Sequence, residues 1–351
     1  MIKVGLIGAG FMGRMHFSQY ARMADRARVV RLCDLLEDRR RGDWSGVGGN
    51  LGDGSGPRLD PGHARPVADW REVVADPEVD MVDLCVPTDL HAGMAVAALE
   101  AGKHVLCEKP MALTVAECDR MLEAAGRCRG LLMIAQCIRF WPEYVFLREA
   151  FRDGRYGAPR ALQFRRQASV PTYSHGQWLQ NPARSGGAIL DLHVHDVDYA
   201  IGLLGRPRSL VARACARPNG SFDRVHALWD CPSVPVVQLE GFWDMPEGFG
   251  FSCGFTAVFE RAALTWDLAS GKPLTVLQDG RPPEAPALLA TDGYYNEIAY
   301  FLDCVAAGRA PAVSTPRESR DAVAVALAEK EAAATGRAVD GASILLPSPR
   351  A

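Results

Sequence analysis

Short apolar segments alternate with helical segments through the first 137 residues, and this alternation constrains the fold more than any other feature of the chain. The strand-like segments are residues 2–8, 27–34, 79–87, 103–110 and 131–137. Helical spacing marks residues 11–24, 69–77, 89–102 and 116–128. Strands that are apolar on both faces and alternate with helices are typical of a parallel sheet covered by helices on both sides. The sequence therefore predicts a doubly wound α/β domain here.

The character of the chain changes after residue 137, where strand-like segments follow one another with little helix between them. These segments are residues 161–169, 209–216, 226–231, 235–244, 251–260, 262–268 and 274–279. Helices are expected at 188–204, 294–308 and 316–336. This order predicts an α+β second domain with an open, mostly antiparallel sheet. We expect domains at 1–137 and 138–351, with the helix at 316–336 packing back on the first domain.

Composition excludes several classes of protein. The 351 residues carry a net charge of −3, which gives no support to nucleic-acid binding. No apolar run approaches the roughly 18–20 residues of a membrane span. The apolar N-terminus leads directly into glycines and is expected to be retained rather than cleaved as a signal peptide. None of the ten cysteines forms a C-x-x-C pair, which favours reduced thiols in a cytoplasmic protein.

A glycine-rich turn follows the first strand. Gly8, Gly10 and Gly13 form the pattern G-x-G-x-x-G, with Phe11 and Met12 between the last two glycines. Gly8 would allow a tight turn, Gly10 a close approach of pyrophosphate, and Gly13 close packing of helix on strand. The free N–H groups at the helix N-terminus would then face the phosphates. The alternative is a glycine turn without a ligand. The surrounding strand and helix favour the dinucleotide site of a Rossmann domain.

Asp34, at the end of the second strand, indicates which dinucleotide is bound. A carboxylate there accepts hydrogen bonds from the ribose hydroxyls and repels a 2′-phosphate, which favours NAD over NADP. Arg39, Arg40 and Arg41 follow closely. An arginine near this position could bind a 2′-phosphate, so NADP is not excluded.

Lys109 stands in the tripeptide Glu108-Lys109-Pro110 at the end of a strand. Ligands of open parallel sheets bind beyond the carboxyl ends of the strands. A lysine there can hydrogen-bond a substrate oxygen and stabilise developing negative charge. Pro110 could fix the turn, with a cis peptide bond as one option. The tripeptide alone favours a solvated surface lysine at a strand–loop junction.

A second candidate group lies at the start of the helix expected over 188–204, just after Gly186 and Gly187. Asp191 and His195 are four residues apart and would share one helical face, so the carboxylate could orient the imidazole for proton transfer. His193 would point elsewhere. A helix with a satisfied polar face is one alternative. A metal site at H-x-H is another, but it would need a strand, so no metal is expected.

These motifs together resemble the glucose–fructose oxidoreductase/inositol dehydrogenase family, Gfo/Idh/MocA. The matching segments extend along the whole chain and include His16 after the glycine pattern, 87–91, 101–105, 108–110, 139–142, Trp178, 186–187, Asp191-x-x-x-His195 and 294–297. The resemblance implies an N-terminal Rossmann domain and a C-terminal domain whose open sheet often forms dimer or tetramer contacts. It also implies small sugar, cyclitol or related polyol substrates.

The resemblance assigns roles residue by residue. Lys109, Asp191 and His195 look like the catalytic set. Three residues look like cofactor-side groups, namely Thr88, His91 and Glu108. Three others look like candidates for lining the substrate pocket, namely Arg139, Trp178 and Tyr295.

Three features depart from the family pattern. Ala188 stands where many members have a third glycine, and His193 where a small residue is common. The Gly-, Pro- and Asp-rich segment 42–66, which predicts a flexible loop or insertion, is longer than typical. These departures bear on the identity of the substrate more than on the type of reaction.

The resulting hypothesis is an NAD(P)-dependent oxidoreductase that interconverts a secondary hydroxyl and a ketone on a sugar, aminosugar or cyclitol. Lys109 and His195 would supply acid–base assistance. One alternative is an NAD-dependent glycoside hydrolase that oxidises its substrate transiently. Another is a non-catalytic nucleotide-sensing regulator. A homodimer or homotetramer is expected.

Overall fold

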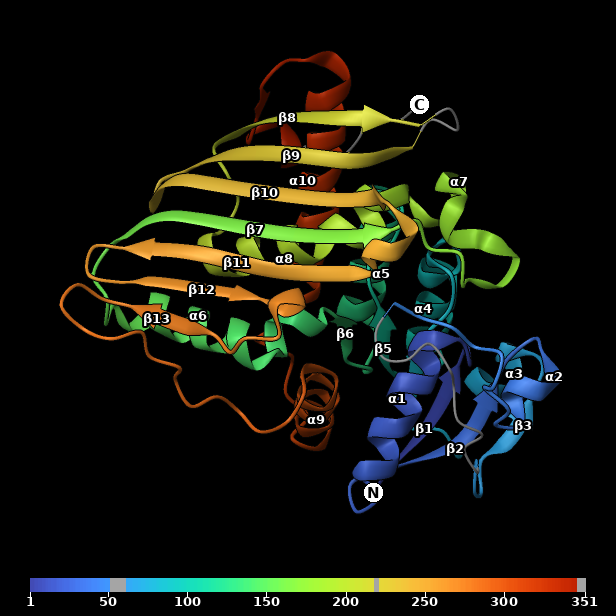
Figure 1. Cartoon of the computed structure of the whole chain (residues 1–351). Helices are drawn as coiled ribbons and strands as arrows, with labels where there is room; N and C mark the ends of the chain where they lie inside the picture. The colour runs from blue at the N-terminus through green and yellow to red at the C-terminus, as the bar shows by residue number, and fades with distance from the viewer. Residues whose placement is uncertain (51–60, 218–220, 346–351) are drawn as a thin grey trace. The chain divides into compact units, whose positions relative to one another are not determined.

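The computed structural model describes residues 1–50, 61–217 and 221–345, which form two compact units (Figure 1). The first unit comprises Met1–Cys137, Thr172–Leu179 and Gly293–Arg320. The second comprises Ile138–Pro171, Gln180–Asp292 and the chain from Asp321 onward. Two segments that follow residue 137 in the sequence therefore belong to the first unit.

The first unit is built on a six-stranded sheet with the order β3-β2-β1-β4-β5-β6, and every pair of neighbouring strands is parallel. This order confirms the predicted doubly wound Rossmann sheet. The elements are β1 (Ile2–Ile7), α1 (Phe11–Arg22), β2 (Ala27–Cys33), α2 (Glu37–Arg40), β3 (Arg65–Val67), α3 (Trp70–Ala75), β4 (Met81–Leu84), the 3₁₀ turn η1 (Thr88–Leu90), α4 (His91–Glu100), β5 (His104–Glu108), α5 (Val115–Arg127), β6 (Leu132–Ala135) and α9 (Gly293–Ala306).

The strands of this sheet are buried because helices cover both faces. All four residues of β4 and all four of β6 are buried, as expected for a parallel sheet. Helix α9 packs against α1, and its Phe301 and Ile298 are fully buried in the same core as Val4 and Leu6 of β1. The core of the first unit thus includes a helix that lies nearly 160 residues beyond β6 in the sequence.

Part of the segment predicted as a loop or insertion, 42–66, is integrated into this unit. Trp44 is fully buried, and its ring centre lies 5.2 Å from that of Phe17 with the two rings tilted by 51°. Its indole N–H donates to the carbonyl oxygen of Ala9 at 2.9 Å. The segment ends in strand β3, which the sequence analysis missed. Residues 51–60 lie outside the described chain, so the rest of this prediction stays untested.

The second unit contains an eight-stranded sheet with the order β13-β12-β11-β7-β10-β9-β8-β14, in which only β7 and β10 pair in parallel. The mostly antiparallel sheet is therefore confirmed. Its elements are α6 (Pro142–Asp153), β7 (Pro159–Ser169), α7 (Pro182–Ser185), the π-helical turn η4 (Ile189–His193), α8 (Val194–Leu204), β8 (Ser209–Ala216), β9 (Phe222–Cys231), β10 (Val234–Met245), β11 (Phe251–Phe259), β12 (Ala263–Asp267), β13 (Thr275–Leu277), α10 (Pro316–Thr335) and β14 (Val339–Asp340).

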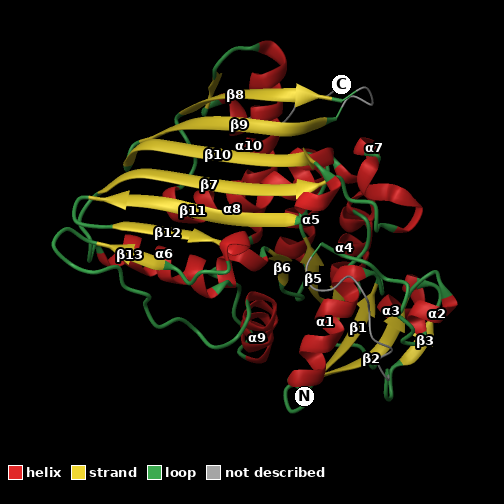
Figure 2. Cartoon of the chain, viewed as in Figure 1, coloured by secondary structure: helices red, strands yellow, loops and turns green. Residues whose placement is uncertain are grey.

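The two faces of this sheet differ. Along β9, buried residues alternate with more exposed ones, as in an antiparallel strand with one covered face. Helices α8 and α10 lie along the covered face (Figure 2). On the other face, Leu228 and Val236 are each 50% exposed and Val211 is 41% exposed. The sheet therefore presents apolar side chains on its uncovered face.

Two helical features differ from the sequence prediction. Helix α6 was missed, although Pro142 at its first turn and Gly154 after its end are ordinary boundary residues. The helix predicted over 188–204 begins with the π-helical turn η4 and continues as α8. A π turn holds more residues per turn than an α-helix, so the predicted common face of Asp191 and His195 does not follow from 3.6-residue spacing.

Within the described residues, no helix is both long enough and apolar enough to span a membrane.

We expect Gly13→Ala to destabilise the first unit. A Cβ at Gly13 would lie 1.8 Å from the carbonyl oxygen of Gly8, so the strand–helix connection would have to move. Overpacking of this kind costs about 1–3 kcal/mol. Urea denaturation should show this loss, whereas Gly126→Ala in α5, where a Cβ meets nothing within 4 Å, should show none. Equal stability of the two variants would contradict the close packing at Gly13.

Candidate functional site

The carboxyl ends of β1, β4 and β5 meet at one edge of the first sheet, because these strands are parallel neighbours. The glycine loop follows β1, the turn η1 follows β4, and Lys109 follows β5. Strand order reverses between β1 and β4, and open α/β sheets bind ligands at such a reversal. The fold thus brings three of the predicted motifs to one edge.

The glycine loop has room for a phosphate close to its backbone. Gly8 has φ of 93°, which favours glycine, and a Cβ there would lie 2.3 Å from the carbonyl oxygen of Cys85. A Cβ at Gly10 would meet only Arg39 Nη1, at 3.9 Å. No side chain caps the N-terminus of α1. The open backbone and the uncapped helix end fit the pyrophosphate of a dinucleotide.

Asp34 is held in place by the backbone on both sides of it. Its Oδ2 accepts a hydrogen bond from the N–H of Ala9 at 2.8 Å, and its Oδ1 accepts one from the N–H of Leu36 at 2.8 Å. The carboxylate is therefore fixed beside the glycine loop, where it can meet ribose hydroxyls.

The three arginines after Asp34 lie in different places. Arg39 reaches the vicinity of Gly10, Arg40 donates to the carbonyl oxygens of Asp34 and Leu35, and Arg41 pairs with Glu37 at 2.8 Å. Of the three, Arg39 is therefore the one whose guanidinium lies beside the glycine loop.

Phe11 and Met12, the variable positions of the glycine pattern, are both half-buried. The Phe11 ring lies 6.0 Å from the ring of Tyr173 and 5.8 Å from the guanidinium of Arg14. A Cβ at Gly49 would collide with the Phe11 ring at 2.1 Å. The segment that carries Trp44 therefore packs against the glycine loop at two points.

Thr88 and His91 follow β4 but have different surroundings. The hydroxyl of Thr88 is buried and has no hydrogen-bond partner among the described residues, so it is available to a ligand. His91 Nδ1 lies 2.8 Å from the carbonyl oxygen of Pro110, and its Nε2 lies 2.9 Å from that of Val86. Burial lowers the pKa of His91, so the neutral ring donates to one of these oxygens at a time. His91 thus ties the end of β4 to the turn after Lys109.

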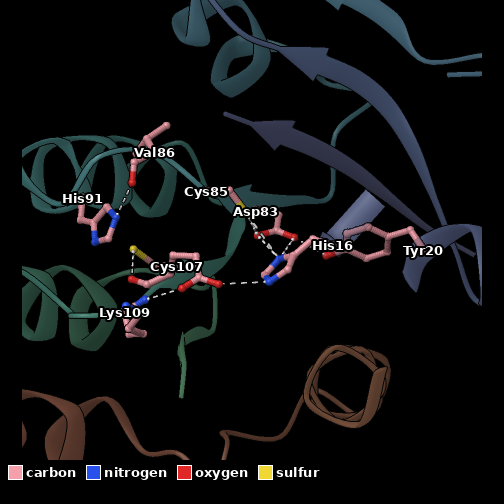
Figure 3. A network of polar contacts seen from close by, with 9 residues as sticks. His16, Tyr20, Asp83, Cys85, Val86, His91, Cys107 and Lys109 are labelled. Carbon is pink, nitrogen blue, oxygen red and sulfur yellow. Dashed lines mark hydrogen bonds and ion pairs between the residues drawn. The ribbon is translucent and has the colours of Figure 1, made fainter. Parts of the chain in front are cut away.

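The Glu108-Lys109-Pro110 tripeptide is anchored to a buried histidine (Figure 3). The Lys109–Pro110 bond is cis, as the sequence analysis allowed. Glu108 Oε2 accepts a hydrogen bond from the N–H of Lys109 at 3.0 Å, and its Oε1 lies 3.2 Å from His16 Nε2. The Glu108 carboxylate therefore faces His16, and the Lys109 side chain is half-buried at the strand end.

His16 lies between two carboxylates. On its other side, Nδ1 lies 2.9 Å from Asp83 Oδ2, which also accepts a hydrogen bond from the hydroxyl of Tyr20 at 2.8 Å. Burial lowers the pKa of His16, but the Asp83 carboxylate and the neighbouring Cys85 outweigh it, so the pKa is raised well above 6.5. A protonated His16 bridges Asp83 on β4 and Glu108 on β5.

The sequence prediction named Glu108 as a cofactor-side residue and His16 as part of the family pattern, but it did not foresee their contact or the part of Asp83 and Cys85 in it. His16, Asp83 and Cys85 present potential metal-ligating atoms within 4.8 Å of one another. Direct hydrogen bonds already join these atoms, and burial followed by Asp83 raises the pKa of the Cys85 thiol, so an ion is not needed to satisfy them. An acidic residue inside the apolar strand β4 was the available sequence signal, because a buried carboxylate requires a partner.

In the second unit, Asp191 lies in η4 and His195 in the first turn of α8, and both are half-buried. Two buried ion pairs hold α8 just beyond His195. Asp196 pairs with Arg166 of β7 at 3.0 Å, and Asp198 pairs with Arg139. The helix that carries His195 is therefore fixed by charged contacts one and three residues further along.

The candidate pocket residues are placed as follows. Arg139 is buried, with its guanidinium bound to the carboxylate and the carbonyl oxygen of Asp198. Trp178 is half-buried in a 3₁₀ segment of the first unit. Tyr295, at the start of α9, packs against α1, where the Arg22 guanidinium lies 4.6 Å from its ring centre. Their roles toward a substrate stay predictions.

We expect protonation of His16 to make stability fall with rising pH. Below pH 6.5 the histidine is protonated in both the folded and the unfolded chain, and its stabilisation is complete. Above pH 6.5 the unfolded chain loses this proton while the folded chain retains it, so up to about 1.4 kcal/mol per pH unit is lost.

Denaturation between pH 6.5 and about 7.5, about one unit below the ordinary cysteine pKa, should show this slope in the native protein. His16→Gln should be less stable at pH 6.5 and should have a flatter profile. Parallel profiles would show that His16 is neutral in the fold.

Two family models match the chain. The model described as an oxidoreductase family with an NAD-binding Rossmann fold matches residues 2–136, and the GFO/IDH/MocA C-terminal domain model matches residues 144–265. The resemblance inferred from the motifs is therefore confirmed over both parts of the chain.

Curated relatives include a myo-inositol 2-dehydrogenase from Thermotoga maritima, 30% identical over 58% of this chain and 55% of the relative. A levoglucosan dehydrogenase from Pseudarthrobacter phenanthrenivorans is 32% identical over 58% of this chain and 51% of the relative. The chain thus matches about half the length of these two proteins. An inositol 2-dehydrogenase from Rhizobium meliloti is 27% identical over 93% of this chain and 95% of its own.

Solved structures match the whole fold. A levoglucosan dehydrogenase in complex with NADH and levoglucosan has a TM-score of 0.82 at 21% identity, covering 97% of this chain and 99% of its own. The UDP-N-acetylglucosamine 3-dehydrogenase of Acidithiobacillus ferrooxidans has a TM-score of 0.75 at 25% identity, and the match covers 94% of this chain and 97% of that chain. With both family models matched and this fold shared, the chain belongs to the Gfo/Idh/MocA oxidoreductase family.

Proposed function

We propose that this protein is an NAD-dependent oxidoreductase that interconverts a secondary hydroxyl and a ketone on a sugar, aminosugar or cyclitol. The observation that carries the proposal is the position of Lys109 at the carboxyl end of β5, on the same sheet edge as the open glycine loop and Asp34. A nucleotide-binding fold alone would not need an ammonium group there.

The cofactor fits the residues of the first unit. The backbone around Gly10 and the N-terminus of α1 would hold the pyrophosphate, Asp34 the ribose, and the Thr88 hydroxyl a further polar group. NAD, when bound, supplies a hydride acceptor. Arg39 beside Gly10 leaves NADP as a second cofactor to be tested, with Asp34 favouring NAD.

Lys109, Asp191 and His195 are the proposed catalytic set. In the oxidation direction, His195 would take the hydroxyl proton, and the hydride on the carbon that bears this hydroxyl would pass to the acceptor that NAD supplies, so that a C=O bond forms. Asp191 orients the imidazole, and Lys109 donates a hydrogen bond to the oxygen as negative charge develops on it. In the reduction direction, His195 returns the proton. The half-buried positions of all three side chains support this assignment.

The names of the relatives suggest which substrates to try first. Myo-inositol and levoglucosan both carry secondary hydroxyls, and relatives are named as dehydrogenases of each. These two compounds, together with a panel of sugars and aminosugars, form the first assay series. Arg139, Trp178 and Tyr295 are the proposed determinants of substrate choice, with Arg139 acting through its buried contact with Asp198.

We expect Lys109→Met and His195→Gln each to lower turnover by about 10²–10⁴-fold, the usual contribution of acid–base groups. NADH formation with the best polyol of the panel measures turnover, and fluorescence titration with NADH measures cofactor binding. Binding should stay within about threefold of the native value, because neither side chain belongs to the proposed cradle.

Lys330→Met, which removes an exposed lysine of α10, is the matched control and should retain full activity. Native turnover in both Lys109→Met and His195→Gln would refute the catalytic assignment. Cleavage of a glycoside without NADH accumulation would show instead that oxidation is transient.

We further propose that the uncovered face of the eight-stranded sheet joins copies of this chain. Leu228 and Val211 are direct partners on β9 and β8, and Val236 lies on the same face of β10. Arg213, His226 and Glu240 lie on the same face, next to these apolar residues. An exposed apolar patch rimmed by polar residues is typical of association surfaces.

We expect Leu228→Glu to lower the mass measured by sedimentation velocity to that of the monomer, because a buried unpaired carboxylate would oppose association. Leu289→Glu, at a loop residue with 54% exposure, is the control and should keep the native mass. A monomeric native protein would exclude this interface.

A further inference from the structure

His193 is fully buried at the end of the π-helical turn η4, and it points into the core of the second unit. Its Nε2 lies 2.6 Å from Oε2 of Glu329 on α10. Its Nδ1 has no hydrogen-bond partner within the described chain, so the proton is best placed on Nε2, where it is donated to Glu329. The turn is thereby bound to a helix more than 130 residues away in the sequence.

Glu329 is also fully buried and depends on this contact. Its other oxygen, Oε1, accepts a hydrogen bond from the indole N–H of Trp229 on β9 at 2.7 Å. A buried carboxylate is costly unless donors satisfy it. Here one donor comes from the sheet and one from η4, so Glu329 fixes the turn relative to both α10 and β9.

Gly241 of β10 makes room for the imidazole. A Cβ at this position would lie 2.8 Å from the Cβ of His193 and 2.9 Å from its Nδ1. Such contacts do not occur without displacement of the neighbour, so the strand can pass this close to η4 only as glycine. His193 is therefore held on one side by close packing against Gly241 and on the other by its hydrogen bond to Glu329.

This contact lies between the two proposed catalytic residues of the second unit in the sequence. Asp191 is two residues before His193 and His195 is two residues after it. A π turn is a rare conformation that is frequently found at functional sites, and it persists only where the surrounding structure holds it. We propose that His193, through Glu329, is a positioning residue that holds η4 so that Asp191 and His195 keep their reactive orientation. This inference rests on the proposed function.

Four variants test it. His193→Leu removes the donor to Glu329 at similar size, and His193→Gln restores a donor at the side-chain end. Gly241→Ala displaces the imidazole from the strand side without removing any polar group. Glu331→Gln, on an exposed position of the same helix, is the matched control.

The first readout needs no substrate. Hydrogen–deuterium exchange of the peptide spanning 186–196 should become at least about tenfold faster in His193→Leu and Gly241→Ala, stay near native in His193→Gln, and be unchanged in Glu331→Gln. Unchanged exchange in both His193→Leu and Gly241→Ala would overturn the anchoring of η4, whatever the enzyme does.

The second readout is the split between kcat and KM for the polyol with NAD. Misplacement of a reacting group by about 1 Å costs up to about 10²-fold, so kcat should fall about 10–100-fold in His193→Leu while KM changes by less than about threefold. His193→Gln should recover most of this loss. Faster exchange with native kcat would overturn the positioning role. A native protein inactive on the whole panel would refute the proposed function, and the exchange data would still decide whether His193 anchors η4.

Discussion

Buried ion pairs hold the two segments that carry the proposed catalytic residues Lys109 and His195. A carboxylate or an imidazolium removed from water must meet a partner, and that partner then restricts where its segment can lie. In the first unit, His16 between Asp83 and Glu108 ties α1 to the ends of β4 and β5. In the second, Asp196 and Asp198 tie α8 to its neighbours. The groups proposed to do chemistry stand next to these pairs and do not belong to them.

This arrangement assigns two tasks to different residues: some hold a segment in place, and others are proposed to contact the reacting atoms. Lys109 is half-buried, yet its backbone N–H is bound to a carboxylate whose own position depends on His16. Removal of a charge at His16 would therefore act on the strand end rather than on the reacting oxygen. Similar logic applies to α8, where Arg166 and Arg139 bind side chains just after His195. Substitutions in these supporting pairs should be interpreted through the segment they hold.

Local patterns predicted the features that depend on neighbouring residues. The glycine spacing, the apolar strands and Asp34 at a strand end led to the Rossmann sheet and the nucleotide loop, because each signal lies within one β-α-β unit. Contacts between residues far apart in the sequence could not be predicted from these local patterns. Trp44 lies in a segment with no periodic hydrophobic pattern, so its burial was not predicted. His16 contacts Asp83, which lies 67 residues away in the sequence. The π turn at Ile189–His193 also escaped, since a 3.6-residue pattern cannot register one extra residue in a turn.

Trp44 has a consequence for observing this protein directly. Its indole is shielded from water, and its N–H is bound to the carbonyl oxygen of Ala9, inside the glycine loop itself. Any ligand that shifts this backbone oxygen changes the environment of a chromophore already present in the chain. Trp44 fluorescence should therefore respond to movement of the glycine loop at Ala9, the residue between the first two glycines of the pattern.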